Sequence, residues 1–160
     1  MEARPVKASK VHMTEMVLPS HTNSLGSIFG GQIVSWIDIA AAISAQRHCS
    51  RPVVTASIDD MHFIAPVYLG WVVNLEASVN YVSRTSMEIG VRVDAENPRT
   101  GELFHTATAY LTFVALDDAG KPMPVPAVKP ETPEEKRRFE DAKVRRKLRL
   151  ERRDLFRKHP

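Results

Sequence analysis

Residues 21–48, HTNSLGSIFGGQIVSWIDIAAAISAQRH, decide the fold, because they join a polar loop to a pair of glycines and one long apolar helix. Asn23, Gly30 and Gly31 precede or open this helix, where turn-forming residues are common and the first backbone N–H groups lack partners. The stretch 33–45 is apolar on nearly every side, which is typical of a buried helix. We therefore expect the rest of the chain to wrap around it.

A single acid interrupts the apolar helix. At about 100° per residue, Asp38 shares its face with four small or apolar residues, Val34, Ala41, Ala42 and Ala45. Burying an ionised carboxylate there costs free energy unless the group has partners or a raised pKa, and either condition makes it a candidate base or nucleophile. The alternative is an acid that faces solvent or pairs with a basic side chain, as most acids in helices do.

The composition limits the class of protein. The chain has 160 residues, of which 43% are hydrophobic, and this suits one domain with a substantial core. Cys49 is the only cysteine, so an internal disulfide is excluded and a reduced, cytoplasmic setting is favoured. No Cys/His cluster has the spacing of a metal site, residues 1–10 contain no apolar core of a secretion signal, and no apolar run has the length of a membrane span. We expect a cytoplasmic protein with no metal and no membrane partner.

Outside this helix, the alternation of apolar and polar residues predicts strands. The clearest covers residues 73–81, where every second residue is apolar, as in a strand with one wet face. Similar patterns or Val- and Ile-rich runs occur at 11–18, 53–64, 87–93 and 107–115. The last four strands along the chain have short connections, so we expect an antiparallel meander folded around the helix, which is an α+β architecture.

The C-terminal part differs in composition. The run KPMPVPAVKP, residues 121–130, contains prolines that do not fit a sheet, so we place the domain at 1–127 and assign 128–160 to a proline-containing linker and a charged helix. Residues 131–160 hold 12 Lys and Arg against 7 Asp and Glu, a balance of +5, whereas residues 1–130 have −2. Because the two signs are interleaved as in a helix with paired charges, we expect no nucleic-acid partner.

Six motifs follow one another along residues 11–127. They are Asn23-x-x-Gly26-x-x-Phe29-Gly30-Gly31, the helix acid Asp38, Phe63-x-x-Pro66-x-x-x-Gly70, Arg84-Thr85-Ser86-Met87-Glu88, Thr112-Phe113-Val114-Ala115 and Pro124-Val125-Pro126. In this order they resemble the hotdog-fold acyl-CoA thioesterases, the family of the bacterial YciA-type enzymes and the animal cytosolic acyl-CoA hydrolases. The resemblance implies a hotdog fold, an antiparallel sheet wrapped around one long central helix, here followed by an extra C-terminal helix.

The resemblance also implies the chemistry, which is hydrolysis of an acyl-CoA thioester to a free acid and CoA. In such enzymes the helix acid, here Asp38, acts as base or nucleophile. The loop asparagine, here Asn23, is the second functional position, and the two are thought to meet across a dimer interface. We therefore expect a homodimer as the minimal active unit and a trimer of dimers as the assembly. CoA belongs to the substrate, and no separate cofactor is implied.

The chemistry of the individual residues fits these roles and leaves simpler interpretations open. Gly30 and Gly31 leave N–H groups at a helix start free to polarise a thioester carbonyl, where charge develops in the transition state. They equally permit close packing of helix on sheet, and Asn23 is equally a turn former or a helix cap.

The remaining candidates concern substrate binding. Arg84, Thr85 and Ser86 combine a cation with two hydroxyls, which suits the phosphates of CoA near the place where the family holds its nucleotide; the alternative is a simple hairpin. Phe63 is one of several large apolar residues expected to line or block a tunnel for the acyl chain.

Two other functions remain open. A hotdog domain can be an acyl-CoA sensor without catalysis, but a sensor does not need an acid beside the thioester. A hotdog dehydratase would be expected to present a His and an acid together, and no His lies in the helix near Asp38.

Overall fold

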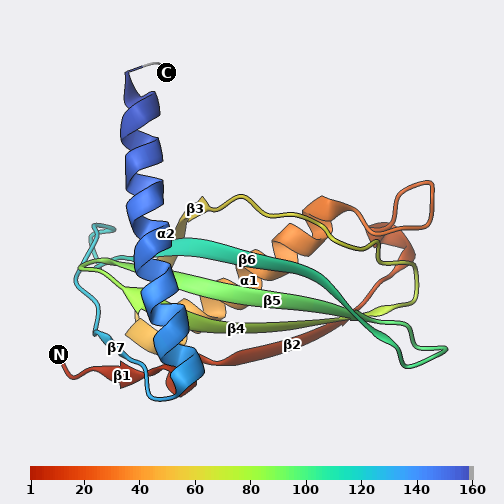
Figure 1. Ribbon diagram of the computed structural model, residues 1–160, viewed down its shortest axis with the longest axis horizontal. Coiled ribbons are helices and arrows are strands. Elements are labelled where there is room, and N and C mark those ends of the chain that lie inside the picture. The colour runs from red at the N-terminus through yellow and green to blue at the C-terminus, as the bar shows by residue number, and fades with distance from the viewer. Residues whose placement is uncertain (159–160) are drawn as a thin grey trace.

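The computed structural model describes residues 1–158, which fold as a five-stranded antiparallel sheet with a helix on each face (Figure 1). The central helix α1 (Gly30–Cys49) packs on the inner face, and α2 (Pro133–Arg157) crosses the outer face. The sheet contains β2 (Val11–Met16), β3 (Val53–Ile58), β4 (Val72–Val82), β5 (Ser86–Glu96) and β6 (Leu103–Ala115). The short elements are β1 (Arg4–Pro5), β7 (Val128–Lys129) and two 3-10 helices, Val6–Ser9 and Pro19–His21. The predicted α+β architecture, with a sheet around a central helix and an extra C-terminal helix, is confirmed.

The strands lie in the order β2-β4-β5-β6-β3. The predicted meander is correct for β4, β5 and β6 but wrong for β3, which pairs antiparallel with β6 at the far edge of the sheet. The second side of β4 is occupied by β2, so β3 does not pair with β4. Residues 59–71 instead run back along the sheet and connect β3 to β4. The strand predicted to run to residue 64 also ends early, at Ile58.

The helix α1 is buried only on the side that meets the sheet. Ile37, Ala40 and Ala41 are fully buried, whereas Ile39 is 48% exposed. The prediction of a helix buried on every side is therefore wrong for the single chain, because one sheet covers only one side of a helix. Figure 1 shows the segment after β3 running along the uncovered flank.

A β-bulge interrupts the pairing of β3 with β6. Thr55 lies opposite Phe113, but Ser57 lies opposite Thr112 and Ile58 opposite Leu111, so Ala56 is the additional residue. Because Phe113 and Leu111 both belong to the core under α1, Thr55 and Ile58 both face the helix although they are three positions apart.

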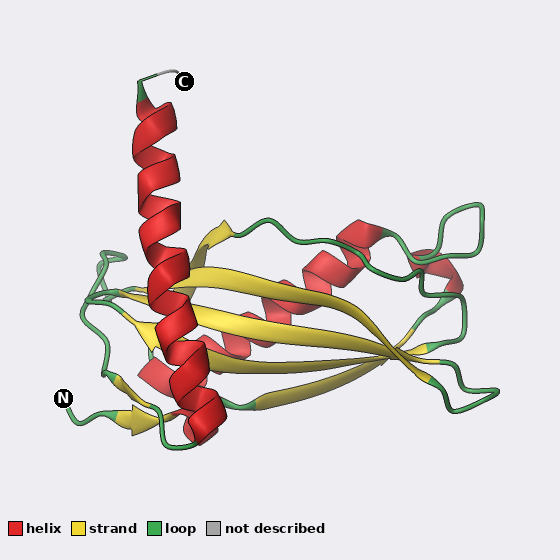
Figure 2. Ribbon diagram, viewed as in Figure 1, coloured by secondary structure: helices red, strands yellow, loops and turns green. Residues whose placement is uncertain are grey.

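The C-terminal helix starts with a capping box between Thr132 and Glu135, followed by a proline in the first turn. Its first half covers the outer face of the sheet, where it buries Ser78 and Asn80, residues that the alternation predicts to be wet. Its last turns extend beyond the body of the domain (Figure 2).

The proline-rich run before α2 is tied to the domain. Val125 and Val128 pack into the core, and β7 pairs in parallel with β1 for two residues, so part of this run does join a small sheet. The expectation that prolines exclude any pairing here is therefore wrong, since Val128 and Lys129 lie between them. The domain boundary at residue 127 stays a prediction. Among residues 1–158, no helix combines the length and the apolar character needed to cross a bilayer.

Candidate active site

Asp38 lies in the middle of α1, half-buried on the flank that faces β3. The hydroxyl of Thr55 donates a hydrogen bond of 2.7 Å to Asp38 Oδ1. Asp38 Oδ2 accepts no hydrogen bond from the described residues, so it is free to accept a proton from a water molecule or to approach an electrophile. The expected partner for the carboxylate is therefore present, and it is a hydroxyl rather than a basic side chain.

Sequence reasoning missed Thr55. Residues 53–64 are interpreted only as a strand, and the bulge that lets Thr55 and Ile58 share the helix-facing side has no marker such as a glycine. The available signal was weak: a hydroxyl in a Val- and Ile-rich strand must face either solvent or a polar partner.

Asn23 organises the loop that precedes α1. Its Oδ1 accepts hydrogen bonds from the backbone N–H of Leu25 and Ser27, and its amide donates to Ser27 Oγ at 3.0 Å. Gly26 has a φ of 79° in the same turn, a conformation that glycine adopts without strain. Asn23 is thus a turn former in the single chain, whereas the alternative of a helix cap is wrong because Phe29 occupies that position.

The helix starts without a side-chain cap. The backbone N–H groups of Gly30 and Gly31 make no hydrogen bond to any residue of the described chain. Gly31 has open space where a side chain would be, but a Cβ on Gly30 would lie 3.2 Å from the Phe63 ring. Packing against a ring therefore explains Gly30, and it brings Phe63, a predicted substrate-binding residue, beside two free N–H groups at the positive end of the helix dipole.

These groups form two separate clusters in one chain. Gly30 and Asp38 are eight residues apart in α1, and at about 1.5 Å per residue this places them about 12 Å apart along the axis. A carbonyl held by the glycine N–H groups is therefore out of reach of the carboxylate of the same chain, because reacting atoms must approach to about 3–3.5 Å.

Arg84, Thr85 and Ser86 lie in or beside the turn between β4 and β5. The strands place this turn near the C-terminal end of α1, at the opposite end of the sheet from Gly30 (Figure 1). Arg84 is exposed, and its side chain makes no ion pair or hydrogen bond with the rest of residues 1–158. The structure thus confirms the hairpin turn and shows that the Arg84 cation is unpaired there among the described residues. Within one chain, this turn does not lie near the other candidate site residues.

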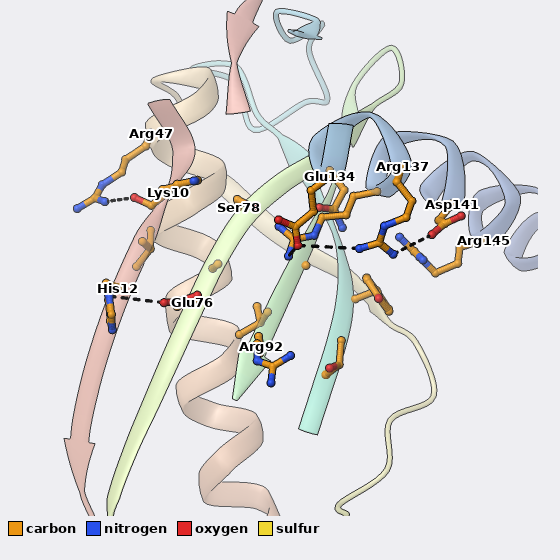
Figure 3. Close-up of a pocket in the computed structure, with 18 residues that line it drawn as sticks. Lys10, His12, Arg47, Glu76, Ser78, Arg92, Glu134, Arg137, Asp141 and Arg145 are labelled. Atoms are coloured by element: carbon orange, nitrogen blue, oxygen red, sulfur yellow. Dashed lines mark hydrogen bonds and ion pairs between the residues drawn. The ribbon is translucent and has the colours of Figure 1, made fainter. Parts of the chain in front are cut away.

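A cleft of about 890 Å³ lies elsewhere, between the outer face of the sheet and α2 (Figure 3). Its walls are charged and internally paired, for example Arg137 with Asp141 at 3.7 Å and His12 with Glu76 at 3.9 Å. None of the predicted site residues lines it. We therefore place the candidate site on the other face of the sheet, along the open flank of α1.

Cys49, the only thiol, lies in the last turn of α1 and is buried. Burial raises the pKa of the Cys49 thiol, which disfavours the thiolate needed for nucleophilic attack.

Comparison with known proteins identifies similar chains. The family model described as Thioesterase superfamily matches residues 25–102. A Bacillus subtilis protein named as an uncharacterized acyl-CoA thioester hydrolase, YkhA, is 50% identical over 134 residues, which are 84% of this chain and 78% of that protein.

Solved structures resemble the whole fold. A hexameric acyl-CoA thioesterase is 45% identical with a TM-score of 0.91, and the match covers 95% of this chain and 97% of that one. An acyl-CoA hydrolase from Staphylococcus aureus, solved with butyryl coenzyme A and coenzyme A, is 36% identical with a TM-score of 0.91 over 98% and 95% of the two chains. Other structures of that hydrolase have an aspartate, an asparagine or a threonine replaced by alanine.

Proposed function

The chain belongs to the Thioesterase superfamily, and from this premise we propose that it hydrolyses acyl-CoA thioesters to a free acid and CoA. The observation that carries the proposal is the half-buried carboxylate of Asp38, held by the Thr55 hydroxyl on an apolar helix flank that the chain leaves open. An acyl chain suits the apolar surface, and a thioester needs only one positioned carboxylate and one oxyanion site.

Asp38 either removes a proton from the attacking water or attacks the thioester carbonyl itself. In both cases Thr55 fixes one carboxylate oxygen and leaves the other to react. The three residue types replaced in the Staphylococcus aureus hydrolase, aspartate, asparagine and threonine, are those of Asp38, Asn23 and Thr55, which supports their assignment to the site.

The free N–H groups of Gly30 and Gly31 polarise the carbonyl and stabilise the oxyanion. Because they lie about 12 Å from Asp38 in the same helix, the site is shared between two copies, each of which supplies one cluster. In this dimer Asn23 acts with the glycines of its own chain, since its turn leads directly into α1.

A symmetric dimer also accounts for the surface that the single chain exposes. The edge strand β3 is largely exposed along its whole length, and unpaired sheet edges usually find a partner. We propose pairing of two copies along this edge, with a trimer of dimers as the full assembly in a cytoplasmic setting. The hexameric relative is consistent with such an assembly.

Substrate binding uses groups from both ends of the sheet. The free guanidinium of Arg84, with the hydroxyls of Thr85 and Ser86 nearby in the chain, binds phosphate groups of CoA. Phe63 lies beside the glycine N–H groups and contacts the acyl chain.

The test is release of free thiol from acetyl-CoA, butyryl-CoA and palmitoyl-CoA by the purified chain. We expect turnover of at least one of them and its loss in Asp38→Asn. Binding of acyl-CoA without thiol release would instead identify a sensor, and release of water from a hydroxyacyl-CoA would identify a dehydratase.

A further inference from the structure

The segment that joins β3 to the start of the site has little backbone support. Its ends are fixed on β6, because Asp59 N–H donates to the Tyr110 carbonyl at 2.9 Å and Ile64 N–H donates to the Thr106 carbonyl at 2.8 Å. Between them, residues 60–63 make no backbone hydrogen bond within the described chain. The position of Phe63 against Gly30 therefore depends on side-chain contacts.

The C-terminal helix supplies such contacts although it lies on the other face of the sheet. Arg149 donates to Asp59 Oδ2 at 2.8 Å, and Arg152 donates to both carboxylate oxygens of Asp60 at 3.1 and 3.2 Å. The first pair is largely enclosed, with side chains 21% and 18% exposed, whereas the second is 66% and 74% exposed. Solvent weakens exposed pairs, so Arg149 is the main connection.

Arg149 is itself fixed from the opposite side. It donates to Glu88 Oε2 at 3.0 Å, and the Glu88 side chain is only 1% exposed. Arg145 donates to the same carboxylate at 2.8 Å and lies over the Tyr110 ring, 3.6 Å from its centroid. The helix therefore remains docked through Arg145 and Glu88 even when the contact with Asp59 is removed.

We propose that Arg149 is a positioning residue for acyl-chain selection: through Asp59 it fixes residues 60–63 and so sets the distance of Phe63 from the helix start. This inference rests on the proposed function, because it assigns Phe63 to the wall of the acyl site. The charge of Arg149, on a helix outside the site, thus affects the space that is available to a long acyl chain within the site.

The decisive variant is Asp59→Asn, which removes the charge on the segment and leaves Glu88 with both arginines. We expect KM for palmitoyl-CoA to rise about fivefold, while kcat for acetyl-CoA stays unchanged. Asp59→Glu retains the carboxylate and should keep a KM close to that of the unmodified chain. Asp60→Asn is the matched control, because its exposed pair contributes little.

Amide hydrogen exchange measures the positioning without relying on activity. In Asp59→Asn, the amides of residues 59 and 64, whose hydrogen bonds to β6 anchor the segment, should exchange faster while the amides of α2 keep their protection. Unchanged exchange at residues 59 and 64, or an unchanged ratio of the KM for palmitoyl-CoA to the KM for acetyl-CoA, overturns the proposal. A uniform fall in kcat together with faster exchange in α2 also overturns it, because the pair would then only hold the helix. If the unmodified chain releases no thiol but residues 59 and 64 exchange faster in the variant, the proposed function is refuted and the positioning by Arg149 remains supported.

Discussion

The hydroxyl of Thr55 donates a 2.7 Å hydrogen bond to Asp38, and this bond connects the edge strand β3 to the middle of the central helix. It occupies one carboxylate oxygen and orients the other. Because β3 is also the exposed edge of the sheet, the group that orients the proposed base lies in the strand where a second copy is expected to pair.

Replacing Asp38 by Asn should lower kcat by at least about a hundredfold, since the amide neither accepts a proton nor attacks a carbonyl. The fold should survive, because Asn keeps the shape of the side chain and can still accept from Thr55. Thiol release under saturating acyl-CoA measures kcat of the variant, and circular dichroism verifies that it is folded. Unchanged turnover in a folded variant would exclude Asp38 as base or nucleophile.

Thr55→Val should lower kcat by about tenfold or more, because a hydrogen bond to a charged group contributes about 1.5–3 kcal/mol. Thr55→Ser keeps the hydroxyl and is the matched control, with kcat expected within about threefold of the unmodified chain. If Thr55→Ser loses as much activity as Thr55→Val, the hydroxyl alone does not explain the effect, because serine retains it. Unchanged kcat in Thr55→Val would refute a role for the hydrogen bond.

A mixed population of Asn23→Ala and Asp38→Ala chains tests whether the site is shared. Each homodimer should be inactive, while a mixed dimer recovers one of its two sites, because one partner then supplies an intact Asn23 and the other an intact Asp38. Activity is measured after subunit exchange has been verified by mass spectrometry. A mixture as inactive as either parent would refute the shared site.

Glu88→Gln should lower the free energy of unfolding by about 3 kcal/mol, the scale for loss of one partner from a buried ion pair. The carboxylate accepts from Arg145, Arg149 and Asn80, and removing its charge leaves two arginines facing a neutral group. Urea denaturation measures the loss. Lys143→Gln is the control, because its pair with Glu140 is exposed and should contribute less than about 1 kcal/mol.

His48 should make the protein sensitive to acid. Burial lowers the pKa of His48 below 6.5, and the charge of Arg4 lowers it further, although the hydrogen bond to the Pro126 carbonyl opposes this. Because a carbonyl only accepts, Nε2 carries the proton, and Nδ1 is buried without a hydrogen-bond partner among residues 1–158. The unfolded chain therefore binds more protons, so the free energy of unfolding should fall as the pH decreases through 6.5 toward the lowered value.

The measurement is the urea midpoint between about pH 8 and about pH 5. His48→Gln can still donate to the Pro126 carbonyl but does not titrate, so its stability should fall less steeply with acid. Equal slopes in the two proteins would show that His48 does not contribute to the acid sensitivity.

The central helix and the meander β4-β5-β6 could be predicted because their signals are local. Apolar periodicity places α1 and these strands, and each strand pairs with its neighbour along the chain. The pairing of β3 with β6 could not be obtained in this way, since it depends on which sheet edge is already occupied by β2.

The same limit applies to charged and polar groups. Glu88 is buried because α2 covers it with two arginines that lie 57 and 61 positions later in the sequence, and no local pattern indicates such a contact. Asp38 is recognisable because an acid in an apolar helix is conspicuous, whereas the side on which Thr55 lies is obscured by a bulge that has no local marker.

The additional residue in β3 has a consequence for engineering. With Ala56 present, a hydroxyl at Thr55 and a methyl-rich side chain at Ile58 share the helix-facing side of one strand. If the same residues followed strict alternation without the bulge, Ser57 would lie opposite Leu111 and Ile58 would turn to the outer side, so a second hydroxyl would replace an apolar side chain on the helix-facing side. The bulge therefore keeps a surface suited to aliphatic acyl groups next to Thr55. Deleting Ala56 would preserve this surface, because Ser57 and Ile58 would stay opposite Thr112 and Leu111, so the strand can be shortened at this position without exchanging its inward-facing residues.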